Sequence, residues 1–543
     1  MTETSAPANW QQRLENPFES HQTFAARLVL LAAFLLRLWK ASGTFLNLDE
    51  AMHFLAANKS SLADAYRTSL NLAHPPLLIL LLHAWRKLGT SEALLRLPSV
   101  LAGTIFCWIF FRWLTRLLGP APGWLGFLLV SFLPAFVELS AEVRQYALLL
   151  CFMMAAAYML ELALVEKSAA KMAACFVFLY LAMFTHFSAL LFAGAMGVYS
   201  LWRLLSDHHP PRRLTAVWVA GQAGAIGLFA FLYVFQISKL KGGASAQHMQ
   251  VLLANSYFHA GRDHLLGFIF ARSFGVLQYT FGQLAVGDIA GLLFVAGIVL
   301  LLVGKEVPEQ PGPSARQLGL FLLLPFAING VAAIVDLYPY GGTRHSAFLL
   351  PFAVAAVSLA IARFTNRRLS SALGIAVLIV AACQVFGAPH RPYMRREDQR
   401  SSNMTQATDA IRQRVAPDDV IFVDFQSSFL LRFYLCPEIS FSGLPPADFR
   451  TFSCAGHRVI STSSETNVWT ADSFLRRWNE MVATCGLKPG QTVWIFQAGW
   501  DIGLARELKE KLPQFRNLKA DSFGRNIFLF EMTVGPDRAR VGS

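Results

Sequence analysis

Long apolar runs separated by short polar segments occupy residues 24–388 of this 543-residue chain. A helix of about 20 apolar residues is long enough to cross the roughly 30 Å hydrocarbon core of a bilayer. Eleven runs reach or approach this length, and we predict a transmembrane helix in each: 24–42, 98–118, 121–139, 145–165, 170–185, 187–205, 214–237, 283–303, 317–336, 346–363 and 369–388. The intervening region 251–282 could hold a re-entrant or interfacial helix.

The composition agrees with a membrane protein. Hydrophobic residues make up 55% of the chain and charged residues only 15%, whereas soluble proteins contain about 25% charged residues. Lipid must therefore solvate much of the apolar surface. The formal net charge of +13 does not predict nucleic-acid binding, because Lys and Arg cluster between the apolar runs. That placement is typical of cytoplasmic loops and of contacts with anionic membrane lipids.

The short loops predict the orientation of the chain. Loops on one side carry twelve Lys and Arg residues, and those on the other carry only Arg144 and Arg344. The positive-inside rule places the first set in the cytoplasm. The N-terminal arm 1–23 is then cytoplasmic, while the large first loop 43–97 and residues 389–543 lie outside. No cleavage site follows the first apolar run, so we expect an uncleaved first span. No eukaryotic sorting signal is evident, so we expect a multi-pass protein of the inner cell membrane of a bacterium.

Residues 389–543 are predicted to form a small extracytoplasmic α/β domain. Predicted strands alternate with amphipathic helices, a pattern typical of α/β folds: strands at 420–424, 458–461, 492–497 and 526–531, and helices at 404–414, 471–485 and 501–512. A disulfide such as Cys436–Cys454 would fit an oxidising compartment, but free thiols at Cys436, Cys454 and Cys485 fit equally well. No CxxC pair is present to suggest a thiolate zinc site.

Ionisable residues from four predicted outer loops gather on the same side of the membrane, where such groups are usually functional. Asp49 and Glu50 follow the first span. A carboxylate there could remove a proton from an attacking hydroxyl, so both are candidate catalytic residues. The alternative is a helix cap, with Asn47 or Asp49 opening a helix at 50–58.

Arg344 and Arg144 are the candidate phosphate-binding residues, because a guanidinium group presents a planar fork to phosphate oxygens. Gly341 and Gly342 precede Arg344 and would let the backbone approach a ligand closely. The alternatives are snorkelling at the end of a span and, for Arg144, a simple pair with Glu142.

Five further residues are candidates for substrate binding: His74, Glu142, Tyr146, His186 and His345. Tyr146 could instead belong to the interfacial aromatic belt, and His186 could be a buried, hydrogen-bonded histidine or a metal ligand. The chain lacks GxxxxGK[ST], GxGxxG, HExxH and GxSxG motifs, which disfavours nucleotide-driven chemistry and serine hydrolysis. An activated donor would therefore have to reach the outer face on a lipid carrier.

The order of these motifs resembles the membrane glycosyltransferases of the GT-C superfamily. The most similar branch contains protein O-mannosyltransferases, the aminoarabinose transferase of lipid A and the RgtA/B/C/D-like enzymes. The resemblance covers roughly residues 20–390 and rests on these segments: Asp49-Glu50, His74-Pro75-Pro76-Leu77, Arg96-Leu97-Pro98-Ser99, Glu142-x-Arg144-x-Tyr146 and Arg344 before an apolar span.

The resemblance implies inverting transfer of a sugar from a polyprenyl-phosphate donor to a lipid, glycan or protein acceptor. Asp49 would be the base, and Arg344, with Arg144 as a second candidate, would hold the phosphate. His345 stands where many relatives have tyrosine, which leaves its role open. Some relatives bind a divalent metal and others do not, so the resemblance predicts no certain cofactor.

Two other classes of function remain as alternatives. A transporter or flippase of a lipid-linked or anionic substrate is disfavoured, because the spans contain few charges and no broken helix is evident. A scaffold protein would use the outer α/β domain for binding.

Overall fold

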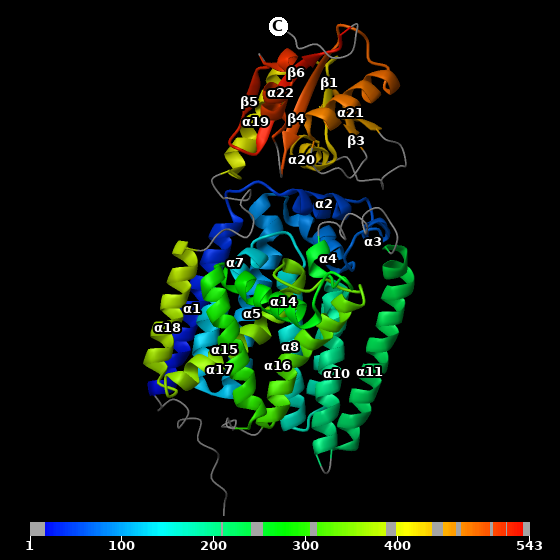
Figure 1. Cartoon of the computed structure of the whole chain (residues 1–543). Coiled ribbons are helices and arrows are strands. Elements are labelled where there is room, and N and C mark those ends of the chain that lie inside the picture. The colour runs from blue at the N-terminus through cyan, green and yellow to red at the C-terminus, as the bar shows by residue number, and fades with distance from the viewer. Residues whose placement is uncertain are drawn as a thin grey trace, which may run out of the picture.

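The computed structural model describes residues 17–207, 210–240, 253–304, 312–386, 398–436, 449–462, 469–499, 503–516 and 518–535. A helical bundle forms the larger part, and a smaller domain with a β-sheet lies at one end of it (Figure 1). The predicted fold class, a polytopic helical membrane protein with a small C-terminal α/β domain, is confirmed. The predicted N-terminal arm up to residue 16 and the predicted boundary at 388/389 lie outside the described residues.

Each predicted span overlaps a helix of the bundle. The helices are α1 (Pro17–Ala41), α5 (Glu92–Leu118), α6 (Pro120–Phe132), α7 (Pro134–Ser140), α8 (Tyr146–Val165), α9 (Ala169–Thr185), α10 (Ser188–Ser206), α11 (Arg212–Leu232), α15 (Leu284–Leu302), α16 (Ala315–Ile334), α17 (Leu350–Phe364) and α18 (Leu369–Phe386). The uncertain region 251–282 contains one more, α14 (Leu265–Phe281). Within the described residues, eight helical segments are long and apolar enough to cross a membrane, or nine with the bent pair α6–α7, so the predicted number of eleven is not confirmed.

The α6–α7 pair is a broken helix, which corrects the expectation from the sequence that no broken helix is present. Its two parts meet at an angle of 56°. Pro134 causes the break, since it has no N–H to donate to the carbonyl of Val130. The guanidinium of Arg37 from α1 donates to that carbonyl at 2.9 Å and to the carbonyl of Ser131 at 2.8 Å. Arg37 therefore satisfies two of the backbone carbonyls that the break leaves free.

Three short helices form the segment between α1 and α5. They are α2 (Leu48–Ala57), α3 (Leu62–Ser69) and α4 (Leu77–Trp85), followed by the 3₁₀ turn η2 (Arg86–Leu88). Asn47 caps α2, as the alternative reading of this segment proposed, and Glu50 completes a capping box. The segment is shorter than the predicted loop 43–97, because α5 already begins at Glu92 and contains Pro98.

The smaller domain contains a six-stranded sheet in the order β2-β3-β1-β4-β6-β5. Strands β3, β1 and β4 are parallel neighbours, and the outer strands pair antiparallel. The bounds are β1 (Val420–Val423), β2 (Phe449–Cys454), β3 (His457–Thr462), β4 (Thr492–Ala498), β5 (Ala520–Ser522) and β6 (Ile527–Thr533), with helices α19 (Ser401–Arg414), α20 (Phe425–Leu435), α21 (Ala471–Thr484) and α22 (Leu504–Lys511). The four predicted strands and three predicted helices are present, whereas β2, β5 and α20 were not predicted. Cys436 and Cys454 form a disulfide, and Cys485 is a free thiol.

This domain packs directly on α2 (Figure 1). The hydroxyl of Tyr434 in α20 accepts a hydrogen bond from the backbone N–H of Leu46 at 2.7 Å. The ring of Phe433 meets that of Phe54 edge-on, with centroids 4.9 Å apart. Helix α2, which carries Asp49, is therefore held between the bundle and the smaller domain.

Candidate active site

Asp49 lies between two arginines that come from distant parts of the chain. Its Oδ2 atom is 2.7 Å from Nη2 of Arg344 and 3.3 Å from Nη1 of Arg144. Asp49 is in the first turn of α2, Arg144 is in the turn between α7 and α8, and Arg344 begins the 3₁₀ helix η5 (Arg344–Leu349). Neither contact uses Oδ1 of Asp49. The fold thus brings together the predicted base and both predicted phosphate-binding residues.

Asp49 and Glu142, which both feel the charges of these arginines, differ in acidity. Burial opposes the ionisation of Asp49, but the charges of Arg144 and Arg344 outweigh it and hold the pKa of Asp49 below its usual range. Burial, followed by repulsion from Glu50, raises the pKa of Glu142 to about 7. Asp49 is therefore ionised at neutral pH, while Glu142 exchanges its proton there. Acid and base roles in enzymes are commonly separated in this way.

Glu50 has surroundings unlike those of a catalytic base. Its Oε1 accepts hydrogen bonds from Nε of Arg96 and the backbone N–H of Val143, at 2.7 and 2.8 Å. Its Oε2 accepts from Nη2 of Arg96 and the backbone N–H of Asn47, at 2.7 and 2.9 Å. Both oxygens are thus occupied by protein donors, in contrast to the catalytic role that the sequence predicted. The carboxylate instead joins α2, α5 and the turn that carries Arg144.

Three histidine rings extend from Asp49 toward the bundle. Nδ1 of His53 is 2.5 Å from the Asp49 carbonyl oxygen, and ring centroids are 6.1 Å apart for His53 and His74 and 5.2 Å apart for His74 and His186. Burial, with a smaller contribution from Arg144, lowers the pKa values of His53 and His186 to about 3. They are therefore neutral at neutral pH. His53 was not predicted, although its position four residues after Asp49 places it on the same helical face.

The remaining candidates occupy the same region. The ring of Tyr146 lies 5.3 Å from that of His186, and the guanidinium of Arg144 is 5.8 Å from the Tyr146 ring centroid. Tyr146 is completely buried, so it does not belong to an interfacial aromatic belt. The backbone carbonyl of His345 accepts a hydrogen bond from Tyr338 at 3.1 Å.

Several buried polar atoms around Asp49 have no hydrogen-bond partner among the described residues. They are Nη1 of Arg344, Nε of Arg144, Oη of Tyr146 and Nε2 of His53. Buried polar groups are nearly always hydrogen-bonded, because leaving them unpaired is costly. The four atoms therefore indicate that a polar ligand or water belongs here. Snorkelling does not explain Arg144, which is only 3% exposed and pairs with Asp49.

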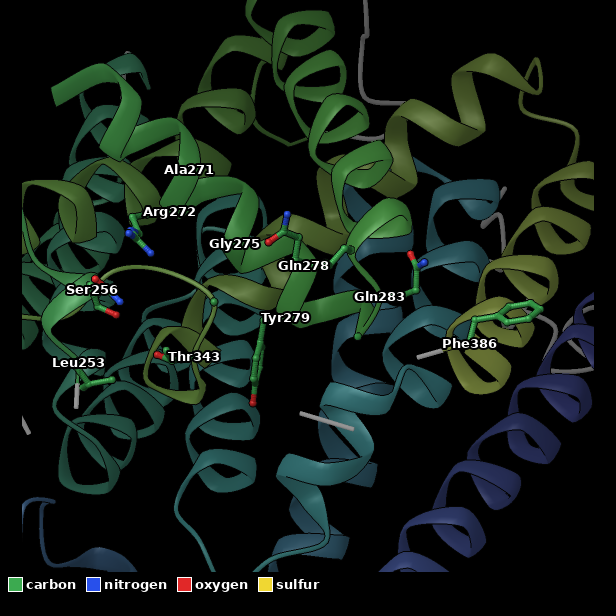
Figure 2. Close-up of a pocket in the computed structure, with 14 residues that line it drawn as sticks. Leu253, Ser256, Ala271, Arg272, Gly275, Gln278, Tyr279, Gln283, Thr343 and Phe386 are labelled. Atoms are coloured by element: carbon green, nitrogen blue, oxygen red, sulfur yellow. The ribbon is translucent and has the colours of Figure 1, made fainter. Parts of the chain in front are cut away.

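A cleft of about 710 Å³ is lined in part by Thr343, the residue that precedes Arg344 in the chain (Figure 2). Thr343 and Gly342 form part of its wall, and α14 contributes Arg272 and Tyr279. The glycine has a role different from the predicted one. A Cβ atom at Gly342 would lie 2.4 Å from the carbonyl oxygen of Gly275, so the glycine is required for close packing against α14.

No group of three or more His, Cys, Asp or Glu side chains within the described ranges is arranged to hold a metal ion.

Comparisons with known proteins agree with this architecture. Residues 73–235 match the family model described as dolichyl-phosphate-mannose-protein mannosyltransferase. The crystal structure of ArnT from Cupriavidus metallidurans bound to undecaprenyl phosphate is similar, with 14% identity, a TM-score of 0.52, and coverage of 93% of this chain and 98% of that one. An Archaeoglobus fulgidus oligosaccharyltransferase tethered to an acceptor peptide gives 9% identity, a TM-score of 0.48, and coverage of 92% and 72%. No curated protein sequence matches. The predicted resemblance is supported: residues 73–235 match this mannosyltransferase family model, and the chain shares its overall fold with the ArnT structure.

Proposed function

We propose that the protein is an inverting glycosyltransferase that moves a sugar from a polyprenyl-phosphate donor to an acceptor on the extracytoplasmic side of the membrane. The observation that carries the proposal is Asp49 held between Arg144 and Arg344, with unpaired buried donors on both arginines. The carboxylate of Asp49 can accept the proton of the attacking hydroxyl. The two arginines can stabilise the anionic phosphate as it leaves. The family model and the ArnT structure both name polyprenyl phosphates, which supports this class of donor.

The donor phosphate would bind at the unpaired guanidinium atoms. Nη1 of Arg344 and Nε of Arg144 are free to donate charge-assisted hydrogen bonds to it. The cleft beside Thr343 would supply a route for the attached lipid, because exposed Leu284 and Phe386 form part of its wall. Figure 2 shows Phe386 at this wall. Arg272, whose Nε is buried and unpaired within the described residues, is a further phosphate-facing candidate in this wall.

The chemical step follows from this placement. The acceptor hydroxyl attacks the anomeric carbon, its proton passes to Oδ1 of Asp49, and the bond from that carbon to the phosphate oxygen breaks. Arg344 and Arg144 stabilise the negative charge that develops on the leaving polyprenyl phosphate. Phosphate binding also draws both guanidinium groups partly away from Asp49, which raises its basicity at the moment of transfer. Glu142, with a pKa of about 7, can then take up the proton.

The membrane orientation belongs to the same proposal. The basic short loops support a cytoplasmic location for the N-terminus and for the ends of the spans opposite to Asp49. The reaction site and the C-terminal domain then face the outside, where the disulfide Cys436–Cys454 can form. The acceptor would therefore be an extracytoplasmic lipid, glycan or protein.

The test uses purified full-length protein in lipid nanodiscs with a panel of radiolabelled polyprenyl-phosphate monosaccharides. We expect the wild type, but not Asp49→Asn, to release sugar from one donor. Asp64→Asn, which changes an exposed carboxylate in the same outer segment, is the matched control and should behave like wild type. A parallel arm with chelator tests metal dependence. Donor crossing a liposome membrane without cleavage would instead establish the transporter alternative.

A further inference from the structure

One glutamine is buried near the end of a helix that is otherwise largely exposed. Helix α11 lies at the edge of the bundle and continues into the π-helix η3 (Tyr233–Ile237), whose first three residues are exposed (Figure 1). Gln236 in η3 is completely buried. A buried amide is costly unless it is hydrogen-bonded, and π-helices often occur at functional sites. The burial of Gln236 therefore has to be explained by its contacts.

The side-chain amide of Gln236 holds a turn of the segment between α1 and α5. Its Nε2 atom donates to the backbone carbonyls of Ser69, Leu72 and His74, at 3.2, 3.0 and 2.7 Å. Ser69 ends α3, and the other two lie in the turn before α4, where the backbone is not helical. Carbonyls in such a turn have no regular backbone partner and must be satisfied in another way. One side chain thus ties the whole turn, up to His74, to the end of a bundle helix.

The backbone of His74 is restrained by two neighbours. Pro75 follows it directly, and a residue before proline is confined to extended conformations. The carbonyl of His74 accepts the shortest of the three bonds from Gln236. Pro75 and Gln236 together therefore set the direction in which the His74 ring leaves the backbone.

The ring of His74 stands between two other imidazole rings. Its centroid is 6.1 Å from that of His53 and 5.2 Å from that of His186, and each pair is inclined by 24°. His53 comes from α2, where its Nδ1 atom contacts the backbone carbonyl of Asp49, and His186 follows α9. The middle ring of the row is thus supplied by the turn that Gln236 holds. A shift of this turn would move the His74 ring away from both of its neighbours.

The contacts of Gln236 also have an ordinary structural explanation. A buried glutamine that satisfies three carbonyls stabilises the packing of α11 whether or not the turn takes part in a reaction. The two explanations predict different measurements. A purely structural bond affects only the unfolding temperature, whereas a positioning residue also affects the rate of transfer per folded molecule.

We propose that Gln236 is a positioning residue for sugar transfer, which holds the His74 ring in the row of imidazoles beside Asp49. The inference rests on the proposed function. Gln236 acts through the backbone of His74 and not through Arg144 or Arg344. Removing its amide should therefore slow transfer without weakening the binding of the donor phosphate. Misplacing a group at an active site by about 1 Å can slow a reaction about 10²-fold, so we expect a loss of about 10- to 100-fold.

The test measures polyprenyl-phosphate binding and single-turnover sugar transfer on full-length protein in nanodiscs, below the unfolding temperature of each variant. Gln236→Met has a side chain of similar length without donors. It should transfer about 10- to 100-fold more slowly and bind the lipid phosphate like the wild type. Gln222→Met is the matched control, because Gln222 lies in α11 against Gly197 of α10, and it should transfer at the wild-type rate. Equal rates for the two variants would overturn the proposal.

A double-mutant cycle tests whether Gln236 acts through His74. In a His74→Ala background, Gln236→Met should have no further effect on the transfer rate. The same fold-loss in both backgrounds would show that Gln236 acts elsewhere, and would overturn the assignment. Gln236→Asn keeps the amide but shortens the side chain by one methylene group, so it is the milder variant if Gln236→Met does not fold. It should give the same pattern with a smaller loss.

Failure of this inference is distinguishable from failure of the proposed function. Absence of sugar release by the wild type from every donor would refute the function itself. Release by the wild type, together with transfer by Gln236→Met at the wild-type rate, would refute only the positioning role of Gln236.

Discussion

Replacing Glu50 by glutamine separates a positioning carboxylate from a catalytic one. The substitution keeps the shape of the side chain but removes its charge and turns one acceptor oxygen into a donor. If the amide oxygen takes the place of Oε1, the bonds from Arg96 Nε and Val143 N–H survive. The bonds to Oε2, from Arg96 Nη2 and from the N–H of Asn47, are lost, because two donors then face each other.

The cost can be worked from these contacts. Both Glu50 and Arg96 are almost completely buried, so the substitution leaves the Arg96 charge without its counterion. Breaking a buried ion pair by removing one partner typically costs about 3–5 kcal/mol. The two lost bonds account for a similar sum, since hydrogen bonds to charged groups contribute about 1.5–3 kcal/mol each. We therefore expect Glu50→Gln to destabilise the protein by about 3–5 kcal/mol.

The assay compares thermal unfolding with sugar release for Glu50→Gln and Asp49→Asn. Glu50→Gln should unfold at a clearly lower temperature and keep part of its activity per folded molecule below that temperature. Asp49→Asn should show the opposite pattern, with near-normal unfolding and no activity. A Glu50→Gln variant of wild-type stability that is inactive would refute the positioning role and restore Glu50 as a catalytic group.

Three more predictions follow from the same contacts. Arg37→Met should destabilise the protein by about 2–6 kcal/mol, because two carbonyls at the α6–α7 break lose their donor; unchanged unfolding in detergent would show that the break needs no such donor. Arg344→Gln should lower kcat for sugar release about 10²- to 10³-fold, with Arg344→Lys recovering part of the loss, and equal rates for all three proteins would remove Arg344 from the mechanism. Folding lowers the pKa of His186 from 6.5 to about 3, so the unfolded state binds the extra proton first as the pH falls. The free energy of unfolding is therefore unaffected by His186 above pH 6.5 and decreases between pH 6.5 and 3, by about 1.4 kcal/mol per pH unit. His186→Gln should therefore weaken the decline of the unfolding temperature between pH 6.5 and 5, and identical pH profiles for variant and wild type would argue against a buried neutral imidazole.

The grouping of the candidate residues could be predicted from the sequence, but the contacts that each of them makes could not. The distribution of Lys and Arg among the short loops predicts that Asp49, Arg144 and Arg344 lie on the same side of the membrane. The fold then brings the three residues into contact. Asp49 and Glu50 are adjacent in sequence, however, and neighbouring positions on a helix point about 100° apart. One side chain therefore reaches Arg344 and the other reaches Arg96. Which carboxylate reaches which arginine depends on how α2 is rotated, and no local pattern specifies that rotation.

The missed elements have similar physical causes. Helix α20 is buried on nearly all sides between the sheet and α2, so its sequence lacks the one-sided apolar stripe of a surface helix. Strand β5 is only three residues long, too short for an alternating pattern. In the sequence, the residues of α6 and α7 form one continuous apolar run, although that run contains Pro134. Its partner Arg37 is remote in sequence, and a single arginine inside an apolar run does not reveal what it contacts.

The central claim is that Asp49 removes the acceptor proton while Arg344 holds the donor phosphate, and one paired measurement tests it most directly. Polyprenyl-phosphate binding and the single-turnover rate of sugar transfer would be measured on the same preparations of wild type and Asp49→Asn. Loss of the base should slow transfer by about 10²- to 10⁴-fold. The lipid phosphate should bind as tightly or more tightly, because the carboxylate that competes for Arg344 is gone. Transfer at the wild-type rate, or binding lost together with transfer, would contradict the account.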